Sequence, residues 1–312
     1  MDSLRAMSDI EVIATGLLFP EGPIAMPDGS VILVEIARGT VTRVQPNGAA
    51  EVVAHTGGGP NGIAFGPDGR IYVCNNGGFP TFIDDRGRTR IGGTADSEVT
   101  LGCIQVVDPD TGSVEVLYEE AGGYHLRAPN DLVFDAVGGF WFTDHGKVWK
   151  RQRDYGAVYY AQPDGSSITE VITNVDAPNG IGLSPDEKRL YVAETHTGRV
   201  RVWNLAEPGQ LDSPYGYKTR GRLLIGLPGE QLLDSLAVDS EDHVCVATIH
   251  NGGVTDIAPD GTSVHIPTGD TITTNICFGG PDMRTAFITG SLNGTLLKTT
   301  WPRPGLRLNF QP

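Results

Sequence analysis

The 312-residue chain lacks a long apolar run, an excess of positive charge and any closely spaced pair of cysteines. No stretch of 18 or more apolar residues occurs, so the sequence predicts no membrane-spanning helix. Asp and Glu number 38 against 23 Lys and Arg, and the formal charge of −15 repels phosphate backbones and anionic lipids. We therefore expect neither nucleic acid nor membrane as a partner.

The cysteines are few and scattered. None belongs to a CxxC pair, which argues against a zinc knuckle, and each lies in or beside an apolar run: Cys74, Cys103, Cys245 and Cys277. We interpret them as buried free thiols of a protein in a reducing compartment. Residues 1–18 hold no continuous apolar stretch that would resemble a signal peptide, so the predicted localisation is cytoplasmic.

Helical periodicity is also scarce, because no segment carries a 3.6-residue apolar stripe longer than about two turns. Turn-forming residues are abundant instead, with 42 Gly and 21 Pro. Pro-Asp-Gly occurs four times, starting at Pro27, Pro67, Pro163 and Pro259. Proline presets φ for the first turn position and glycine accepts a positive φ later in the turn. The flanking runs are short and rich in β-branched and aromatic residues, which is typical of strands.

One template recurs six times: a polar residue, a short apolar run, a turn and a second apolar run. The copies are aligned on a leading Asn, Asp or Glu, and these leading residues are Glu21, Asn61, Asn130, Asn179, Asp234 and Asn275. They are separated by 40, 69, 49, 55 and 41 residues, a spacing that suits four-stranded antiparallel blades with their loops.

The repeat predicts an all-β fold, a six-bladed β-propeller formed by a single domain over residues 1–312. A β-sandwich or jelly roll is the alternative, which six similar motifs at near-regular spacing disfavour. The longest step contains a polar, Gly-rich segment at about residues 77–101, which we interpret as a long loop. Such a loop either shapes a pocket or is an excursion on the surface.

The innermost strand of each blade lines the channel of a propeller, so the six leading residues are expected to converge at one end of it. All of them offer oxygen atoms and none is Lys or Arg, which suits a hard divalent cation. Turn chemistry is the alternative explanation for any single one of these residues, because Asn and Asp favour turns. The sixfold recurrence favours the cation site.

Several segments in this order resemble the gluconolactonase/regucalcin (senescence marker protein) family, which is related to diisopropyl fluorophosphatase. The resemblance covers about residues 11–299 and rests on PEGP at 20–23, APND at 128–131, WFTD at 141–144, APNG at 177–180, LDSLAVD at 233–239 and TNICFGGPDMRTAFIT at 274–289. The sequence departs from the family at Ala128, where some members have Arg, at His145, and at Ser235, where glycine is frequent.

The resemblance implies one divalent metal ion at the mouth of the channel, with the ligands Glu21, Asn130, Asn179 and Asp234. Ca²⁺ is the expected ion, and Mg²⁺, Mn²⁺, Zn²⁺ and Fe²⁺ are alternatives. The predicted function is hydrolysis of a sugar lactone or related cyclic ester. The metal would act as a Lewis acid and Asp234 as the general base.

Further polar residues are predicted to bind the small-molecule substrate: His145, Asn76, His196, His250, Asn275 and Arg127. Two other functions remain open, a phosphotriesterase-like hydrolase on the same site and a non-catalytic calcium-binding propeller. A serine hydrolase is excluded because the sequence has no GxSxG motif.

Overall fold

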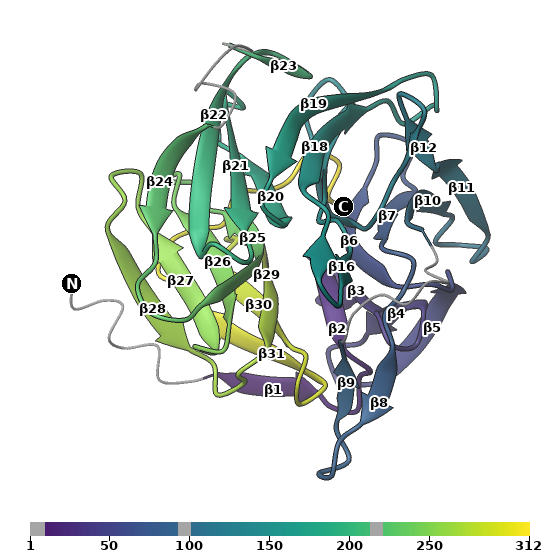
Figure 1. Ribbon diagram of the computed structural model, residues 1–312. Coiled ribbons are helices and arrows are strands. Elements are labelled where there is room, and N and C mark those ends of the chain that lie inside the picture. The colour runs from purple at the N-terminus through teal and green to yellow at the C-terminus, as the bar shows by residue number, and fades with distance from the viewer. Residues whose placement is uncertain (1–9, 93–100, 213–220) are drawn as a thin grey trace.

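The computed structural model describes residues 10–92, 101–212 and 221–312. The regular secondary structure in these residues consists of strands, which turns and loops connect. Six antiparallel sheets stand around a common centre as the blades of a β-propeller (Figure 1). The predicted fold class is therefore confirmed, whereas a single domain over 1–312 stays a prediction. The described residues include no helix, and hence none with the length and apolar character needed to span a bilayer.

Blades 1 to 3 follow one another along the chain, and each runs from the centre outward. Blade 1 contains β2 (Pro20–Ala25), β3 (Val31–Glu35), β4 (Thr40–Val44) and β5 (Ala50–His55). Blade 2 contains β6 (Pro60–Phe65), β7 (Ile71–Asn75), β10 (Cys103–Val107) and β11 (Val114–Tyr118). Blade 3 contains β14 (Pro129–Phe134), β15 (Phe140–Asp144), β18 (Gly156–Ala161) and β19 (Ile168–Val175).

Blades 4 to 6 complete the ring, and the last blade joins the two ends of the described chain. Blade 4 contains β20 (Pro178–Leu183), β21 (Arg189–Glu194), β22 (Arg199–Glu207) and β24 (Arg222–Gly226), with β23 (Gln210–Leu211) also paired to β22. Blade 5 contains β25 (Leu232–Val238), β26 (Val244–Ile249), β27 (Gly253–Ile257) and β28 (Ser263–Pro267). Blade 6 contains β29 (Thr273–Gly279), β30 (Thr285–Gly290), β31 (Thr295–Thr300) and, as its outer strand, β1 (Glu11–Ala14).

Three short hairpins extend from the blades: β8 (Thr81–Ile83) with β9 (Thr89–Ile91), β12 (Glu120–Ala121) with β13 (Tyr124–His125), and β16 (Val148–Trp149) with β17 (Gln152–Arg153). The first of them lies inside the segment predicted as a long loop at about 77–101, so part of this segment forms a short hairpin. Residues 93–100 of that segment lie outside the described residues.

The turns form as the sequence predicts. Glycines 29, 69, 165 and 261 of the four Pro-Asp-Gly motifs all have φ between 76° and 87°, a range that favours glycine. Two of these turns connect the first and second strands of a blade, and two connect the third and fourth. The four cysteines are free, and three of them are buried.

The hydrophobic core lies between the blades rather than at the axis. All six inner strands are buried along most or all of their length: β2, β6, β14, β20, β25 and β29. Apolar clusters fill the wedges between neighbouring sheets, and Trp141 and Trp301 are among the largest fully buried side chains. The wedges fix the sheets around the axis, and the axis carries the polar residues.

The C-terminal residues 301–312 cross one end of the central channel, and the C-terminus lies near the middle of the ring in Figure 1. Leu306, Leu308 and Gln311 line a channel cavity of about 60 Å³ whose remaining walls come from all six inner strands. The amide of Gln311 donates to the carbonyls of Ala25 and Phe278, in blades 1 and 6. The segment therefore closes this end of the channel.

Candidate functional site

Six oxygen-bearing residues gather at the start of the inner strands, as the repeat predicts. All of them are buried: Glu21, Asn61, Asn130, Asn179, Asp234 and Asn275. In every inner strand the pairing with the second strand loses register at or beside this residue. A bulge redirects a side chain that regular pleating would place elsewhere. The same local irregularity thus recurs six times around the axis.

Glu21 receives its orientation from the neighbouring blade. Its Oε2 accepts hydrogen bonds from the amide of Asn275, at 2.7 Å, and from the backbone N–H of Gly22. Oε1 is buried and has no hydrogen-bond partner among the described residues. The Oδ1 of Asn275 accepts from the N–H of Ile276 at 2.7 Å. Both polar ends of Asn275 are therefore engaged, and its predicted contact with substrate stays a prediction.

Asn61 and Asn130 carry the same feature in blades 2 and 3. The Oδ1 of each is buried without a hydrogen-bond partner in the part of the chain that the structure describes. A buried amide oxygen that makes no hydrogen bond costs roughly 1–3 kcal/mol. Together with Oε1 of Glu21, three such oxygens lie on successive inner strands, which indicates that something missing from the polypeptide satisfies them.

Asn179 and Asp234 are tied to each other in blades 4 and 5. The amide nitrogen of Asn179 donates to Oγ1 of Thr195 at 3.1 Å, and its side chain also bonds the Asp234 carboxylate. The backbone carbonyl of Asn179 accepts from the hydroxyl of Thr143 at 2.6 Å. These contacts join Asn179 to Asp234 and to residues in or just after the second strands of blades 3 and 4.

Burial dominates the electrostatics of the ring of six residues around the axis. It raises the pKa of Asp234 to about 7, and it raises the pKa of Glu21 well above its ordinary value, with the Asp234 carboxylate adding to the effect. No ion pair among the described residues involves either carboxylate. Unpartnered oxygens and uncompensated carboxylates fit a hard divalent cation, which prefers oxygen ligands. The donor set therefore agrees with the metal that the sequence predicts.

Asn76, His145 and His196 lie in loops that follow the second strands of blades 2 to 4. Asn76 is buried; its Oδ1 accepts from the N–H of Gly78, and its Nδ2 has no partner in the part of the chain that the structure describes. The rings of His145 and His196 meet edge to face, with centroids 5.6 Å apart. Burial, followed by the effect of His196, lowers the pKa of His145 to about 4, so its ring is neutral at neutral pH.

Arg127 and His250 are less closely connected to the ring. The Arg127 side chain is half exposed, and its Nε lies 3.7 Å from the carboxylate of Asp154. His250 is exposed at a backbone position with φ of 72°, and its Nδ1 lies 3.7 Å from Glu230. Neither side chain has a hydrogen bond to a predicted metal ligand among the described contacts. Their roles in substrate binding stay predictions.

Two buried charged residues near the ring were not predicted from the sequence. Asp131 directly follows Asn130, and burial raises its pKa to about 7. Lys147 is 3% exposed, and its ammonium donates to the carbonyl oxygens of Asn76 and Gly78 and lies 5.2 Å from the ring centre of Phe79. The motif APND contained the signal for Asp131, whereas no local pattern marks Lys147 as buried.

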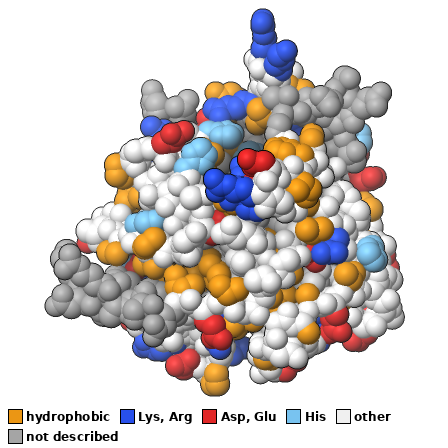
Figure 2. Space-filling model, turned by 90° about the horizontal axis from the view of Figure 1, so that it is seen from below, with side chains coloured by type: hydrophobic (Ala, Val, Ile, Leu, Met, Phe, Trp, Pro, Cys, Tyr) orange, Lys and Arg blue, Asp and Glu red, His pale blue; other side chains and the backbone are white. Residues whose placement is uncertain are grey.

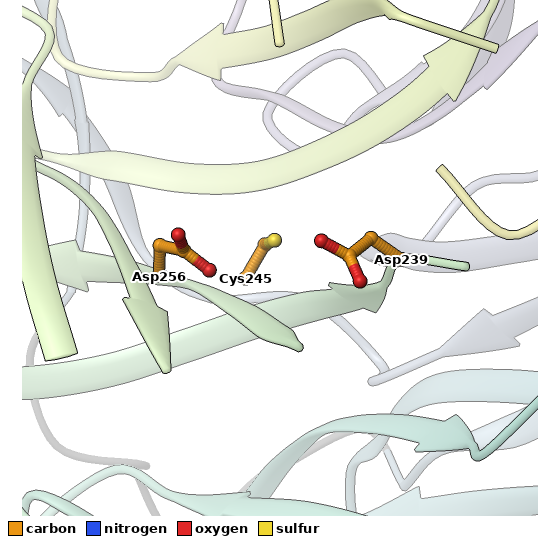
Figure 3. A group of neighbouring side chains, drawn as sticks. All are labelled: Asp239, Cys245 and Asp256. Carbon is orange, nitrogen blue, oxygen red and sulfur yellow. The ribbon is translucent and has the colours of Figure 1, made fainter. Parts of the chain in front are cut away.

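A second cluster of potential metal ligands lies in blade 5, where the Cys245 thiol sits between the carboxylates of Asp239 and Asp256 (Figure 3). Arg303 already supplies the positive charge there, because its guanidinium donates to Asp239 at 2.5 Å and to Asp256 at 2.7 Å. Burial raises the pKa of Cys245 well above its ordinary value, so the thiol stays protonated. We therefore interpret this cluster as an internal ion-pair network that anchors the C-terminal segment.

The surface does not carry charge of a single sign on the side seen in Figure 2. Positively charged, negatively charged and hydrophobic side chains are interspersed across that view. The charged groups there are dispersed, in contrast to the concentrated set of oxygens at the axis.

Comparisons with known proteins bear on the family of the chain. The model of the SMP-30/gluconolactonase/LRE-like region matches residues 19–291. The chain is 30% identical to lactonase drp35 of Staphylococcus saprophyticus, with 78% of this chain and 68% of that protein covered. It is 28% identical to a gluconolactonase of Zymomonas mobilis, with 95% of this chain and 83% of that protein covered.

Among solved structures, a gluconolactonase of Xanthomonas campestris superposes with a TM-score of 0.74 at 23% identity. The superposition covers 97% of this chain and 93% of that one, and it supports the six-bladed fold. The family match spans most of the chain and includes all six residues of the ring. The chain therefore belongs to the SMP-30/gluconolactonase/LRE-like family.

Proposed function

We propose that this protein is a metal-dependent lactonase that hydrolyses a sugar lactone or a related cyclic ester. The observation that carries the proposal is the set of buried oxygens on Glu21, Asn61 and Asn130 that have no partner within the described residues, in a chain whose relatives are named lactonases. Glu21, Asn130, Asn179 and Asp234 would hold the cation, and Asn61 lies beside them. When bound, a divalent cation supplies Lewis-acid stabilisation of charge that develops on a carbonyl oxygen.

Asp234 is the proposed general base. Its carboxylate has two oxygens, so one can face the cation while the other accepts a proton from the attacking water. The water oxygen forms a bond to the acyl carbon, the ring C–O bond breaks, and the departing alkoxide takes up a proton. The product is a hydroxy acid. The hydrogen bond from Asn179 fixes the orientation of the Asp234 carboxylate for this transfer.

The loops around the mouth would contact the substrate. His145 carries no charge at neutral pH, so it offers a neutral donor or acceptor and an aromatic face rather than a cation. Asn76 offers an amide N–H that has no partner within the described chain. These groups suit a neutral cyclic ester with hydroxyl or ether oxygens.

The test is acid production in weak buffer from sugar, alkyl and aromatic lactones, with chelated protein and after Ca²⁺, Mg²⁺, Mn²⁺ or Zn²⁺ is restored. We expect metal-dependent turnover of one lactone class, and Asp234→Asn should lower kcat by at least about 100-fold. Asp260→Asn is the matched control, because Asp260 is an exposed turn residue of the same blade.

Two outcomes would contradict the proposal. Faster cleavage of P–F or P–O bonds than of any lactone would assign the site to a phosphotriesterase-like hydrolase. Tight cation binding without turnover of the whole panel would assign it to a non-catalytic calcium-binding propeller. Full activity of Asp234→Asn would remove the role of Asp234 as base but leave the lactonase in place.

A further inference from the structure

The position after each ring residue differs between blades in a way that the proposed function leaves unexplained. In chain order these positions hold Gly22, Gly62, Asp131, Gly180, Ser235 and Ile276. Asp131 and Ser235 thus occupy equivalent sites on blades 3 and 5, on either side of blade 4. Ser235 is also the position at which the sequence departs from the glycine frequent in the family.

The glycines of blades 2 and 4 let the inner strands of blades 3 and 5 approach closely at this level. A Cβ atom on Gly62 would lie 2.5 Å from Oδ1 of Asp131, and one on Gly180 would lie 2.7 Å from the backbone carbonyl carbon of Ser235. Real Cβ atoms do not approach other heavy atoms this closely, so the inner strands lie too near each other for side chains at the two glycines.

Both side chains are buried and fully engaged. The Asp131 carboxylate accepts from the backbone N–H of Leu132 at 2.9 Å, from the backbone of Ile181 in blade 4 and from the hydroxyl of Ser235 in blade 5. Ser235 is 0% exposed, and its Oγ also lies 3.5 Å from Oδ1 of Asn179. One hydroxyl therefore contacts both the carboxylate next to Asn130 and the amide of Asn179.

We propose that Asp131 and Ser235 form a hydrogen-bonded bridge across blades 3, 4 and 5 that positions Asn130, Asn179 and Asp234 for the cation. Asn130 and Asp234 are the chain neighbours of the two bridge residues, and Asn179 contacts the bridge directly. The inference rests on the proposed cation site. In this inference Asp131 and Ser235 position the ligands of the cation, and neither of them is itself a ligand.

The chemistry of the bridge explains why a serine occupies this site. A serine hydroxyl has one proton, and a carboxylate is a stronger acceptor than an amide oxygen. The bond from the hydroxyl to Asn179 Oδ1 is long, at 3.5 Å, and an amide oxygen has two lone pairs, so Asn179 keeps a lone pair for a cation. With donors from Leu132, Ile181 and Ser235, the Asp131 carboxylate is satisfied by the protein and stays out of the ligand set.

Loss of hydrogen bonds that orient metal ligands typically lowers metal affinity 10- to 100-fold. We therefore expect Ser235→Ala to weaken Ca²⁺ binding by about 10- to 100-fold in isothermal titration calorimetry on the full chain. Alanine removes only the hydroxyl, so the close packing against Gly180 is preserved. The double variant with Asp131→Asn should lose less affinity than the two single losses combined, because both variants break the same bridge.

Ser184→Ala is the matched control. Ser184 is also 0% exposed, and its hydroxyl binds Asp186 and the N–H of Arg189 in a turn of blade 4. Both alanine variants remove a buried hydroxyl that makes hydrogen bonds, so both should lower the melting temperature of the metal-free protein. Only Ser235→Ala should change the affinity for Ca²⁺.

Wild-type affinity in Ser235→Ala, with or without a lower melting temperature, would overturn the inference and leave the cation site intact. An equal loss of affinity in Ser184→Ala would also overturn it, because the effect would then come from general destabilisation. If the wild-type chain binds none of Ca²⁺, Mg²⁺, Mn²⁺ and Zn²⁺, the proposed site itself fails. The variants separate that outcome from failure of the bridge alone.

Discussion

The buried carboxylates of the ring make cation binding depend on pH. Burial raises the pKa of Asp234 to about 7 and that of Glu21 well above its ordinary value. A cation binds the ionised carboxylate, so binding must displace any proton present. At pH 6 a carboxyl group with a pKa of about 7 is about 0.9 protonated, so Asp234 alone should release about 0.9 proton per cation bound.

The affinity should follow the same equilibrium. Below pH 7, each proton that the cation must displace lowers the apparent affinity by about tenfold per pH unit. Between pH 7 and pH 5, displacement from Asp234 alone corresponds to a loss of roughly 50-fold, and Glu21 adds to it. Above pH 8 the affinity should be nearly constant as far as Asp234 determines it.

The pH dependence of the stability of the metal-free protein gives a second measure of the raised pKa of Asp234. The pKa of Asp234 is higher in the folded state than its ordinary 3.8, so the unfolded chain loses this proton first as pH rises. The metal-free protein should therefore lose stability from about pH 4 to about pH 7 through this group. His145 acts oppositely, because its folded pKa of about 4 lies below the ordinary 6.5. His145 contributes equally to the stability of the metal-free and the Ca²⁺-bound protein. The difference in stability between samples with Ca²⁺ and with chelator therefore reports on the carboxylates.

The assay is calorimetric titration of Ca²⁺ at pH 6 in two buffers that differ in ionisation heat, with melting curves in Ca²⁺ and in chelator from pH 4.5 to 8. We expect release of at least about 0.9 proton per ion at pH 6 and a stabilisation by Ca²⁺ that grows with pH. Asp260→Asn should behave as the wild type does, because this exposed carboxylate has a lowered pKa. Binding without proton release, at an affinity that is constant from pH 5.5 to 7.5, would refute the reasoning.

Two further predictions concern the way the ring is held closed. Arg303→Gln should lower the free energy of unfolding in urea by about 3–5 kcal/mol, because it removes the guanidinium from two buried carboxylates and leaves Asp256 with only His243 as an ion-pair partner among the described residues. Arg43→Gln is the control, because the pair of Arg43 with Asp28 is much more exposed and should cost far less when it is lost; equal losses would contradict the argument. Deletion of residues 1–14 removes β1 and its pairing with β31, and calorimetry should show a melting temperature lower by roughly 6 °C for a loss of about 3 kcal/mol; an unchanged temperature would mean that this strand does not help to close the ring.

The repeat predicted most of the fold because its signals are local. Apolar runs such as 31–34 and 140–142 lie within β3 and β15, and the Pro-Asp-Gly turns connect strands as expected. The hairpin of β8 and β9 was missed because its strands have three residues each and are not buried. A short exposed strand leaves no apolar alternation in the sequence to detect.

The candidate site was predictable to the extent that it repeats. The sixfold register brought Glu21 and Asp234 together although 213 positions separate them. The burial of Lys147 and the contact between Asp131 and Ser235 arise between blades, where no pattern along the chain reports them. His250 follows its apolar run as His145 does, yet it lies at an exposed turn because the left-handed backbone there directs it outward.

The C-terminal segment that covers one end of the channel has a kinetic consequence. Leu306, Leu308 and Gln311 line the cavity on the side opposite the mouth, so the channel is closed at that end and does not pass through the molecule. A ligand that reaches the ring must leave by the route through which it entered. The hydroxy acid formed in the proposed reaction would then occupy the route by which the substrate enters, and its inhibition of the enzyme would be competitive with the substrate.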